Sequence, residues 1–282
     1  MFRNRDLRTR GAVSLLMLVW LFVLLPYGCA PGSQQGQDAP SPEKQQQQVG
    51  DADRAPHPGT GVTLTHKLEY EANGSIRTGQ LLYQDRNYPE GSFTVLILLH
   101  DEFGVDDWLY SRAEEYTEMG YVVVCPNLSG LGGHEARDRQ VLDNIEAALV
   151  ASSTVIPGCD TSTDRAVIGW DIGGTYALTC ARYMDLRGAV ICYGQLITNA
   201  EGLLGVREPL LGIYGMDDPN TSMDTLEEFR ETLARMGGQY KAIVWRDEGR
   251  LFLRHPRDPA RARDAEFEIT SWLHKYCTPN QG

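Results

Sequence analysis

The sequence predicts an α/β protein with a doubly wound, mostly parallel sheet. From about residue 62 to 276, strand-like apolar runs alternate with helix-like amphipathic segments. Several runs, such as TVLILLH at 94–100, are apolar at nearly every position. An unbroken apolar run indicates a strand covered on both faces, as in parallel sheets. The functional loops of such folds lie at the carboxyl ends of the strands.

The folded part is expected to open with a hairpin, because two alternating segments meet at Asn73-Gly74, the strongest short hairpin signal. The buried strand at 94–100 follows. A helix is then predicted over 107–120, closed by Gly120, and a strand over 121–126 is stopped by Pro126.

The second half repeats this alternation. Apolar residues at helical spacing predict a helix over 139–152, and RAVIGW (165–170) predicts a strand that turns into a helix over 175–184. Three more strands and two more helices complete the pattern: strands at 188–194, 209–215 and 240–245, and helices at 223–238 and 259–276.

The first 28 residues have the features of an export signal. Four arginines precede a 14-residue segment, AVSLLMLVWLFVLL, with a single polar side chain. This segment is shorter than the ~20 residues that span a membrane. Gly28 before Cys29 resembles a lipobox, although Pro26 and Tyr27 depart from its usual pattern. We expect a lipoprotein signal peptide at 1–28 and a lipid-modified Cys29; an uncleaved signal anchor and ordinary secretion are the alternatives.

Residues 29–61 are expected to form a disordered tether, because they hold a glutamine run, many Pro, Gly and Ser residues and scarcely any apolar side chain. A single folded domain then occupies 62–282. Removing 1–28 takes four Arg and one Asp from the 26 basic and 38 acidic residues, which leaves a net charge of −15. Such a charge disfavours nucleic acid as a partner. The predicted location is the bacterial cell envelope, with the lipid anchor in a membrane.

No metal or cofactor site is predicted. The cysteines lack metal-ligand spacing, and Cys125 and Cys192 lie in strand-like runs as buried thiols. The glycines at 130, 132 and 133 lack the strand, lysine and serine context of a phosphate loop.

The segment GWDIGG (169–174) lies where a strand is expected to turn into a helix, with Asp171 at its centre. Small residues flank Asp171 because a turn this sharp would drive side chains into neighbouring backbone. The central residue takes a positive φ, which aspartate tolerates better than most residues. This layout is that of a nucleophile elbow. An ordinary strand-to-helix turn is the alternative.

Three further segments resemble the dienelactone hydrolase family. HDEFG (100–104), followed by a helix and GYVVVCPNL (120–128), resembles the family's H/Q-E-x-F-G and G-Y-V-V-x-x-P-D-L segments. GMDDP (215–219) resembles its acid loop, and WRDEGRLF (245–252) lies where the family has Y-x-x-x-x-H-G-F. The resemblance covers about 62–276 and implies an α/β-hydrolase fold with an ester or lactone substrate.

The resemblance also implies a changed catalytic triad. Asp171 replaces the cysteine or serine nucleophile, Asp218 keeps the acid, and Arg250 replaces the histidine. Arginine keeps its proton in ordinary protein sites, so Arg250 cannot be the base. The sequence instead predicts a carboxylate–guanidinium–carboxylate cluster of these three residues. A solvated Arg250 with no partner is the alternative.

Other site residues follow from the same resemblance. The backbone N–H groups of Glu102 and Ile172 match the oxyanion-hole positions. Asp101 stands at the family's glutamate beside the nucleophile, and Trp170, directly before the elbow, is expected to shape the cleft.

Two histidines are weaker candidates for the missing base. Related α/β-hydrolases with an aspartate nucleophile still use a histidine to activate the water that cleaves their ester intermediate. His255 lies five residues beyond the expected place, and His100 lies at the mouth of the expected cleft.

We favour a catalytically silent or impaired relative that binds a ligand or a partner in the envelope. An active hydrolase of esters or lactones is one alternative. The other is a hydrolase with Asp171 as nucleophile and an unorthodox base. Family likeness predicts the fold better than the reaction.

Overall fold

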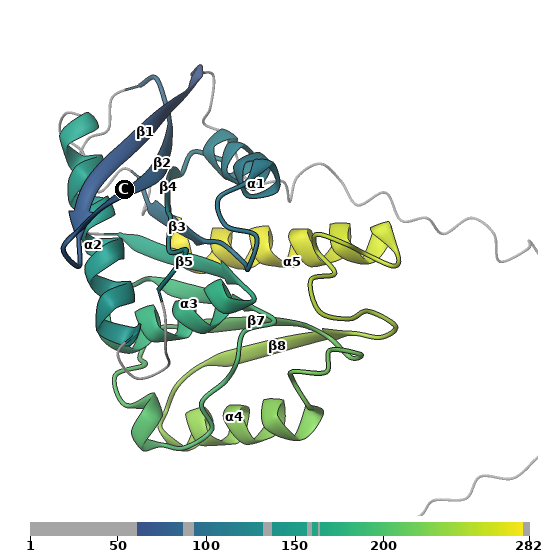
Figure 1. Cartoon of the computed structure of the whole chain (residues 1–282). Coiled ribbons are helices and arrows are strands. Elements are labelled where there is room, and N and C mark those ends of the chain that lie inside the picture. Colours follow the sequence, from purple (N-terminus) through teal and green to yellow (C-terminus); the bar gives the residue numbers. More distant parts are fainter. Residues whose placement is uncertain (1–60, 87–92, 132–136, 157–159, 163, 279–282) are drawn as a thin grey trace, which may run out of the picture. The chain divides into compact units, whose positions relative to one another are not determined.

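The computed structural model describes residues 61–86, 93–131, 137–156, 160–162 and 164–278 (Figure 1). The predicted signal peptide, Cys29 and the predicted tether up to residue 60 lie outside these residues. Among the helices of the described ranges, none combines the length and the apolar character that crossing a membrane would need.

The described residues form an eight-stranded sheet with the order β1-β2-β4-β3-β5-β6-β7-β8. Strand β2 runs antiparallel to β1 and β4, and the other neighbours are parallel. The predicted doubly wound, mostly parallel sheet is confirmed. Its strands are β1 (Thr63–Ala72), β2 (Ser75–Gln84), β3 (Val95–Leu99), β4 (Val122–Pro126), β5 (Arg165–Trp170), β6 (Gly188–Cys192), β7 (Leu210–Gly215) and β8 (Tyr240–Trp245).

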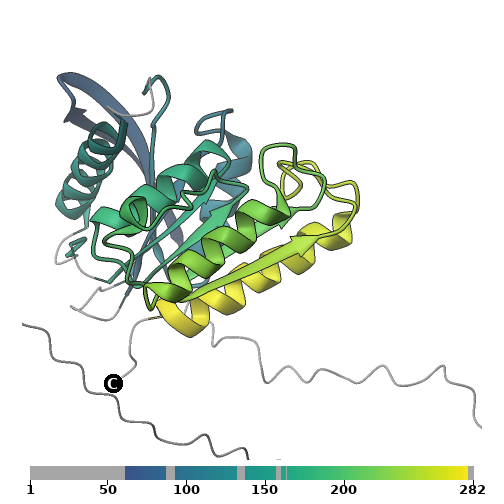
Figure 2. The ribbon, with the colours of Figure 1, turned by 90° about the horizontal axis from the view of Figure 1, so that it is seen from below.

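Helices cover both faces of the sheet. One face packs against α1 and α5, and the other against α2, α3 and α4 (Figures 1 and 2). Strand β3 shows why its sequence is apolar throughout, because Ile97 faces one core and Leu96 and Leu98 face the other. The helices are α1 (Asp107–Glu118), α2 (Arg137–Val155), α3 (Ile172–Tyr183), α4 (Met223–Arg235) and α5 (Pro259–Cys277), with a short 3-10 helix, η2 (Glu201–Leu203), that the sequence did not predict.

The predicted hairpin is present, and its turn has the backbone that the sequence demands. Asn73 and Gly74 have φ values of 53° and 70°, so both central residues are left-handed, as in a type I′ turn. Asp106 caps the N-terminus of helix α1, and its carboxylate accepts a hydrogen bond from the N–H of Leu109 at 3.1 Å.

Strands β3, β5, β7 and β8 are parallel, so their carboxyl ends lie at one edge of the sheet. The loops that leave this edge carry the predicted site residues at 101–102, 171–172, 218 and 250.

Candidate active site

A sharp turn joins β5 to α3 and places Asp171 at its apex. Asp171 has φ 54° and ψ −114°, the strained backbone predicted for this position. A Cβ on Gly169 would lie 1.9 Å from the carbonyl oxygen of Gly173, and one on Gly173 would lie 2.1 Å from that of Leu99. The glycines are therefore required by close backbone approach, as the sequence indicated.

Asp171 is held by a bidentate ion pair with Arg250. The Nε atom of Arg250 donates to Oδ1 of Asp171 at 2.8 Å, and Nη2 donates to Oδ2 at 2.6 Å. The side chains are 13% and 29% exposed for Asp171 and Arg250, so the pair is partly screened from water. The hydrogen bonds to Asp171 raise the pKa of the Arg250 guanidinium further above its ordinary value. The solvated, unpaired Arg250 is thus excluded, and the pair predicted from the sequence is present.

The second half of the predicted cluster is wrong. Within the described residues, Asp218 forms no ion pair with Arg250, and the other carboxylate on this guanidinium is the side chain of Glu102, whose Oε1 lies 3.2 Å from Nη2. The physical reason is geometric: a guanidinium donates in one plane, and the Nε and Nη2 atoms of Arg250 are both aligned on Asp171.

Asp218 is left with one free oxygen as a result. Its Oδ1 atom accepts from the N–H of Asn220 at 2.8 Å, while Oδ2 is buried with no hydrogen-bond partner. The residue is 5% exposed. Burial raises the pKa of Asp218 above its ordinary value, and the nearby charges of Arg250 and Asp171 act on it in opposite directions.

The predicted oxyanion-hole donors are free. Among the described residues, the backbone N–H groups of Glu102 and Ile172 donate no hydrogen bond to the backbone. Ile172 is the first residue of α3, so its N–H points outward at the positive end of the helix dipole. These two groups can still receive a carbonyl oxygen of a ligand.

A second ion cluster, centred on Arg254, was missed by the sequence reasoning. Arg254 donates to both carboxylate oxygens of Asp101, at 2.8 and 3.2 Å, and to those of Asp106, at 2.6 and 3.1 Å. Its guanidinium also lies over the rings of Phe103 and Trp108, 4.9 and 4.5 Å from their centroids. The sequence could have indicated that Asp106 caps the N-terminus of α1, but nothing in it paired Asp106 with Arg254, almost 150 positions away.

Neither Asp101 nor Trp170 lines an open cleft, which corrects two predicted pocket residues. Asp101 is 1% exposed because Arg254 holds its carboxylate. Trp170 is 0% exposed, since its position on β5 directs the indole into the core beneath α1 and α5. It contacts Trp108 edge to face, with ring centroids 5.3 Å apart, and Trp108 in turn packs against the Arg254 guanidinium.

The two histidine candidates do not replace the missing base. His100 is buried; its Nε2 accepts from the N–H of Leu128 at 2.8 Å, so its Nδ1 carries the proton and donates to the carbonyl of Asp101 at 2.7 Å. Burial lowers the pKa of His100, which keeps it neutral in a structural role. His255 is exposed and packs edge to face on Phe103, with ring centroids 6.2 Å apart.

The loop that carries Arg250 is fixed by a buried acid. Glu248 is 1% exposed and accepts hydrogen bonds from the N–H groups of Arg257, at 3.1 Å, and Asp258, at 2.8 Å. Its own carbonyl accepts from the N–H of Asp217 at 2.9 Å, which ties this loop to the one that bears Asp218. Arg250 therefore leaves a rigid loop rather than a solvated one.

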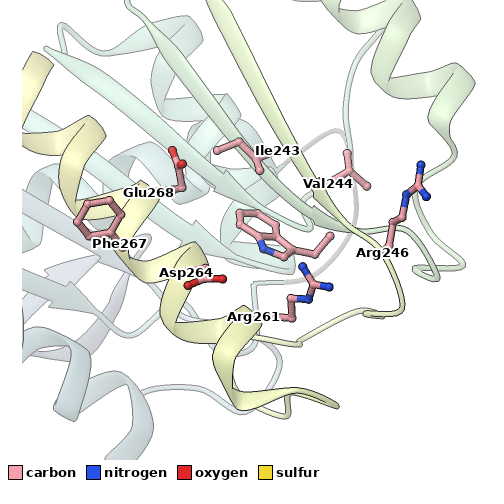
Figure 3. Close-up of a pocket in the computed structure, with 8 residues that line it drawn as sticks. Ile243, Val244, Arg246, Arg261, Asp264, Phe267 and Glu268 are labelled. Carbon is pink, nitrogen blue, oxygen red and sulfur yellow. The ribbon is translucent and has the colours of Figure 1, made fainter. Parts of the chain in front are cut away.

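A surface groove of about 540 Å³ lies between β8 and α5 and contains none of the predicted site residues (Figure 3). Its walls mix apolar and charged side chains of both signs, without a convergent set of polar groups. Among the described residues, no group of three or more His, Cys, Asp or Glu side chains is arranged to hold a metal ion. The groove is lined by Ile243, Val244, Trp245, Arg246, Arg261, Asp264, Phe267 and Glu268.

Comparisons with known proteins agree with this architecture. Residues 83–277 match the sequence profile of the dienelactone hydrolase family. A probable 2-oxo-3-(5-oxofuran-2-ylidene)propanoate lactonase from Bradyrhizobium is 24% identical over 71% of this chain and 90% of its own length. Among solved structures, a dienelactone hydrolase-like promiscuous phosphotriesterase from metagenomic libraries has a TM-score of 0.64 at 19% identity, covering 77% of this chain and 99% of its own. A thermophilic esterase from Thermogutta terrifontis has a TM-score of 0.59 at 15% identity, covering 77% and 96%.

Proposed function

The chain belongs to the dienelactone hydrolase family, and we propose that it is a non-hydrolytic member that binds a carbonyl-containing ligand in the bacterial envelope. The family fold is retained, and the N–H groups of Glu102 and Ile172, the oxyanion-hole positions that the family resemblance implies, make no backbone hydrogen bond among the described residues, which supports the proposal. The nucleophile and the base have been replaced together by residues that neutralise each other.

The bidentate pair between Asp171 and Arg250 carries this proposal. A carboxylate whose two oxygens each accept a charge-assisted hydrogen bond is a poor nucleophile, because the attacking oxygen must give up its hydrogen bond and the ester that forms no longer carries the charge that holds Arg250. A covalent ester on Asp171 would also need a base to activate water, and Arg250 does not release its proton. His100 is neutral but both ring nitrogens are already engaged in the core. Binding without turnover is the function that these groups support.

Ester turnover by the full-length protein tests the proposal. Hydrolysis of 4-nitrophenyl acetate and of a neutral lactone should not exceed the rate of the Asp171→Ala variant. Activity that disappears in Asp171→Ala would refute the non-hydrolytic function. Mass spectrometry would then show whether a covalent ester accumulates on Asp171, the result expected of an aspartate nucleophile.

The double variant Asp171→Cys with Arg250→His provides the matched gain-of-function control. It restores a nucleophile and a base beside the retained Asp218 and the free N–H groups. Measurable esterase activity in the double variant, with none in either single variant, would show that only the substituted pair prevents catalysis.

Export and lipid attachment are the second part of the proposal and rest on residues 1–29 of the sequence. Metabolic labelling with a fatty-acid analogue should mark the full-length protein in bacteria, and Cys29→Ala should abolish the label. A labelled Cys29→Ala variant would contradict lipidation at this residue. An unlabelled but membrane-bound protein would favour an uncleaved signal anchor.

A further inference from the structure

We propose that two copies of this protein associate through the outer edge of β8 and the adjoining face of α5, with the two β8 strands antiparallel. The surface contains none of the candidate-site residues, so the inference does not depend on the proposed function. It follows from free backbone groups on β8, from the hollowed face beside them and from the balance of charge on that face.

Strand β8 is an edge of the sheet and presents free backbone groups. It pairs with β7 alone, and the carbonyls of Gln239 and Trp245 accept hydrogen bonds of 2.9 Å from N–H groups at either end of β7. Because alternate residues of a strand bond to the same neighbour, Tyr240, Ala242 and Val244 point their N–H and C=O groups away from β7. Among the described residues, none of these three forms a backbone hydrogen bond outside the strand pairing itself.

The other edge of the sheet, β1, is protected by charge. Its exposed side chains include Lys67, Glu69 and Glu71. Charged side chains on an edge strand discourage pairing with a strand of another chain. Strand β8 (YKAIVW) carries one charged residue, Lys241, and is otherwise apolar or aromatic. Of the two edges, β8 is therefore the one open to a further strand.

The face of α5 next to β8 is hollowed along the strand. The groove of about 540 Å³ in Figure 3 lies beside the carboxyl half of β8, and a second hollow of about 370 Å³, lined in part by Tyr240, Trp272 and Tyr276, lies beside its amino half. The side chain of Phe267, in the first hollow, is 68% exposed. A six-residue strand spans about 20 Å, too narrow for the roughly 800 Å² that each partner of a stable dimer buries, so α5 has to contribute.

The charges of this face fit a second copy of the same chain. The whole chain carries a net charge of −12, so two copies repel each other over most of their surface. The groove in Figure 3 is lined by two cations, Arg246 and Arg261, and by two anions, Asp264 and Glu268, whose charges cancel. A two-fold interface brings a patch against itself, so equal numbers of both signs allow opposite charges to meet.

Two-fold symmetry requires the two β8 strands to run antiparallel. With Ala242 on the axis, its N–H and C=O groups exchange two hydrogen bonds with those of the other copy. Tyr240 then lies opposite Val244, and Lys241 lies opposite Ile243. This register places the smallest side chain of β8 against itself and sets no two like charges opposite each other. Both α5 helices lie on the same face of one continuous sheet, where they cover the hollows.

Sedimentation equilibrium of the full-length protein in a neutral detergent tests the inference. A dimer is expected, and Ala242→Pro should raise its dissociation constant by about tenfold or more, because symmetry removes an N–H donor from both copies. The fold should survive, since the N–H of Ala242 points away from β7 and edge strands tolerate proline. Glu69→Pro is the matched control on β1, where the same alternation points the N–H of Glu69 away from β2. It should leave the dissociation constant unchanged.

Phe267→Ser tests the α5 face without changing the backbone. Phe267 is 68% exposed, so its loss should weaken association while the thermal transition of the protein stays in place. Leu204→Ser is the matched control, because Leu204 is 63% exposed and lines neither hollow. Far-UV circular dichroism checks that each variant is folded.

Three results would overturn the inference. The first is a protein that is monomeric at all concentrations. The second is association that neither Ala242→Pro nor Phe267→Ser weakens, which is also what association through residues 1–28 would give. The third is a Glu69→Pro variant that dissociates as readily as Ala242→Pro, since pairing would then use the β1 edge.

Discussion

Replacing the buried acid Asp218 should stabilise the protein. Asp218 is 5% exposed, its Oδ2 has no partner, and the guanidinium that could have served it is bonded to Asp171. In Asp218→Asn the remaining oxygen can still accept from the N–H of Asn220, and the buried charge is gone. The variant therefore exchanges a buried charge for a neutral amide and keeps its one hydrogen bond.

The magnitude follows from the unsatisfied oxygen. An unpartnered buried polar group costs about 1–3 kcal/mol, and more when it is charged. Loss of the attraction between Asp218 and Arg250 offsets part of the gain, and loss of the repulsion from Asp171 adds to it. We expect the free energy of unfolding at pH 7 to rise by about 1 kcal/mol, which for a domain of this size corresponds to about 2–4 °C in Tm.

The pH dependence of stability checks independently that Asp218→Asn is stabilising rather than destabilising. Burial raises the pKa of Asp218 above its ordinary value of 3.8, so the folded state binds this proton more tightly than the unfolded state. The cost of ionised Asp218 therefore appears as pH rises from 3.8 through the folded-state pKa, and it is absent below 3.8. The advantage of Asp218→Asn should follow the same course.

Urea denaturation of both proteins from pH 3.5 to 8 measures this difference, with Asp217→Asn as a control for an exposed, paired acid. A variant that is less stable than the unmodified protein at pH 7 would refute the reasoning. It would mean that Asp218 is satisfied in solution.

Other substitutions have equally definite outcomes. Arg250→Ala leaves Asp171 partly buried without its partner and should lower the free energy of unfolding by about 1–2 kcal/mol in urea denaturation. This value is smaller than that of a fully buried pair because the Arg250 side chain is 29% exposed. Arg250→Lys cannot form a bidentate pair and should recover only part of the loss. Burial raises the pKa of Glu266 to about 7, so the free energy of unfolding should fall as pH rises from 4.5 to about 7. Glu266→Gln should remove this dependence and raise the free energy of unfolding above pH 7 by roughly 2–3 kcal/mol, which Tm measured against pH would show. Gly173→Ala places a Cβ 2.1 Å from the carbonyl oxygen of Leu99 and should cost more than about 4 kcal/mol, seen as insoluble protein or loss of the cooperative thermal transition.

Much of the fold could be predicted from the sequence because local signals and burial agreed. The unbroken apolar runs became strands covered on both faces, and Asn73-Gly74 became the left-handed turn of the first hairpin. The glycines around Asp171 indicated a tight elbow, because a constraint of backbone on backbone is encoded in the residues next to it. The short helix η2 escaped prediction, since three residues carry too little periodicity to be read.

The sequence by itself determined the family resemblance, the order of the elements and the presence of an arginine where the resemblance implies a histidine, because each depends on residue type and position along the chain. Only the tertiary structure decided the partners of the charged groups. Arg250 bonds Asp171 and Glu102 and leaves Asp218 alone, while Arg254 joins Asp101 to Asp106. The reason is that several carboxylates lie within reach of either arginine at the same sheet edge, and the direction in which each planar guanidinium points is set by packing between residues far apart in the chain.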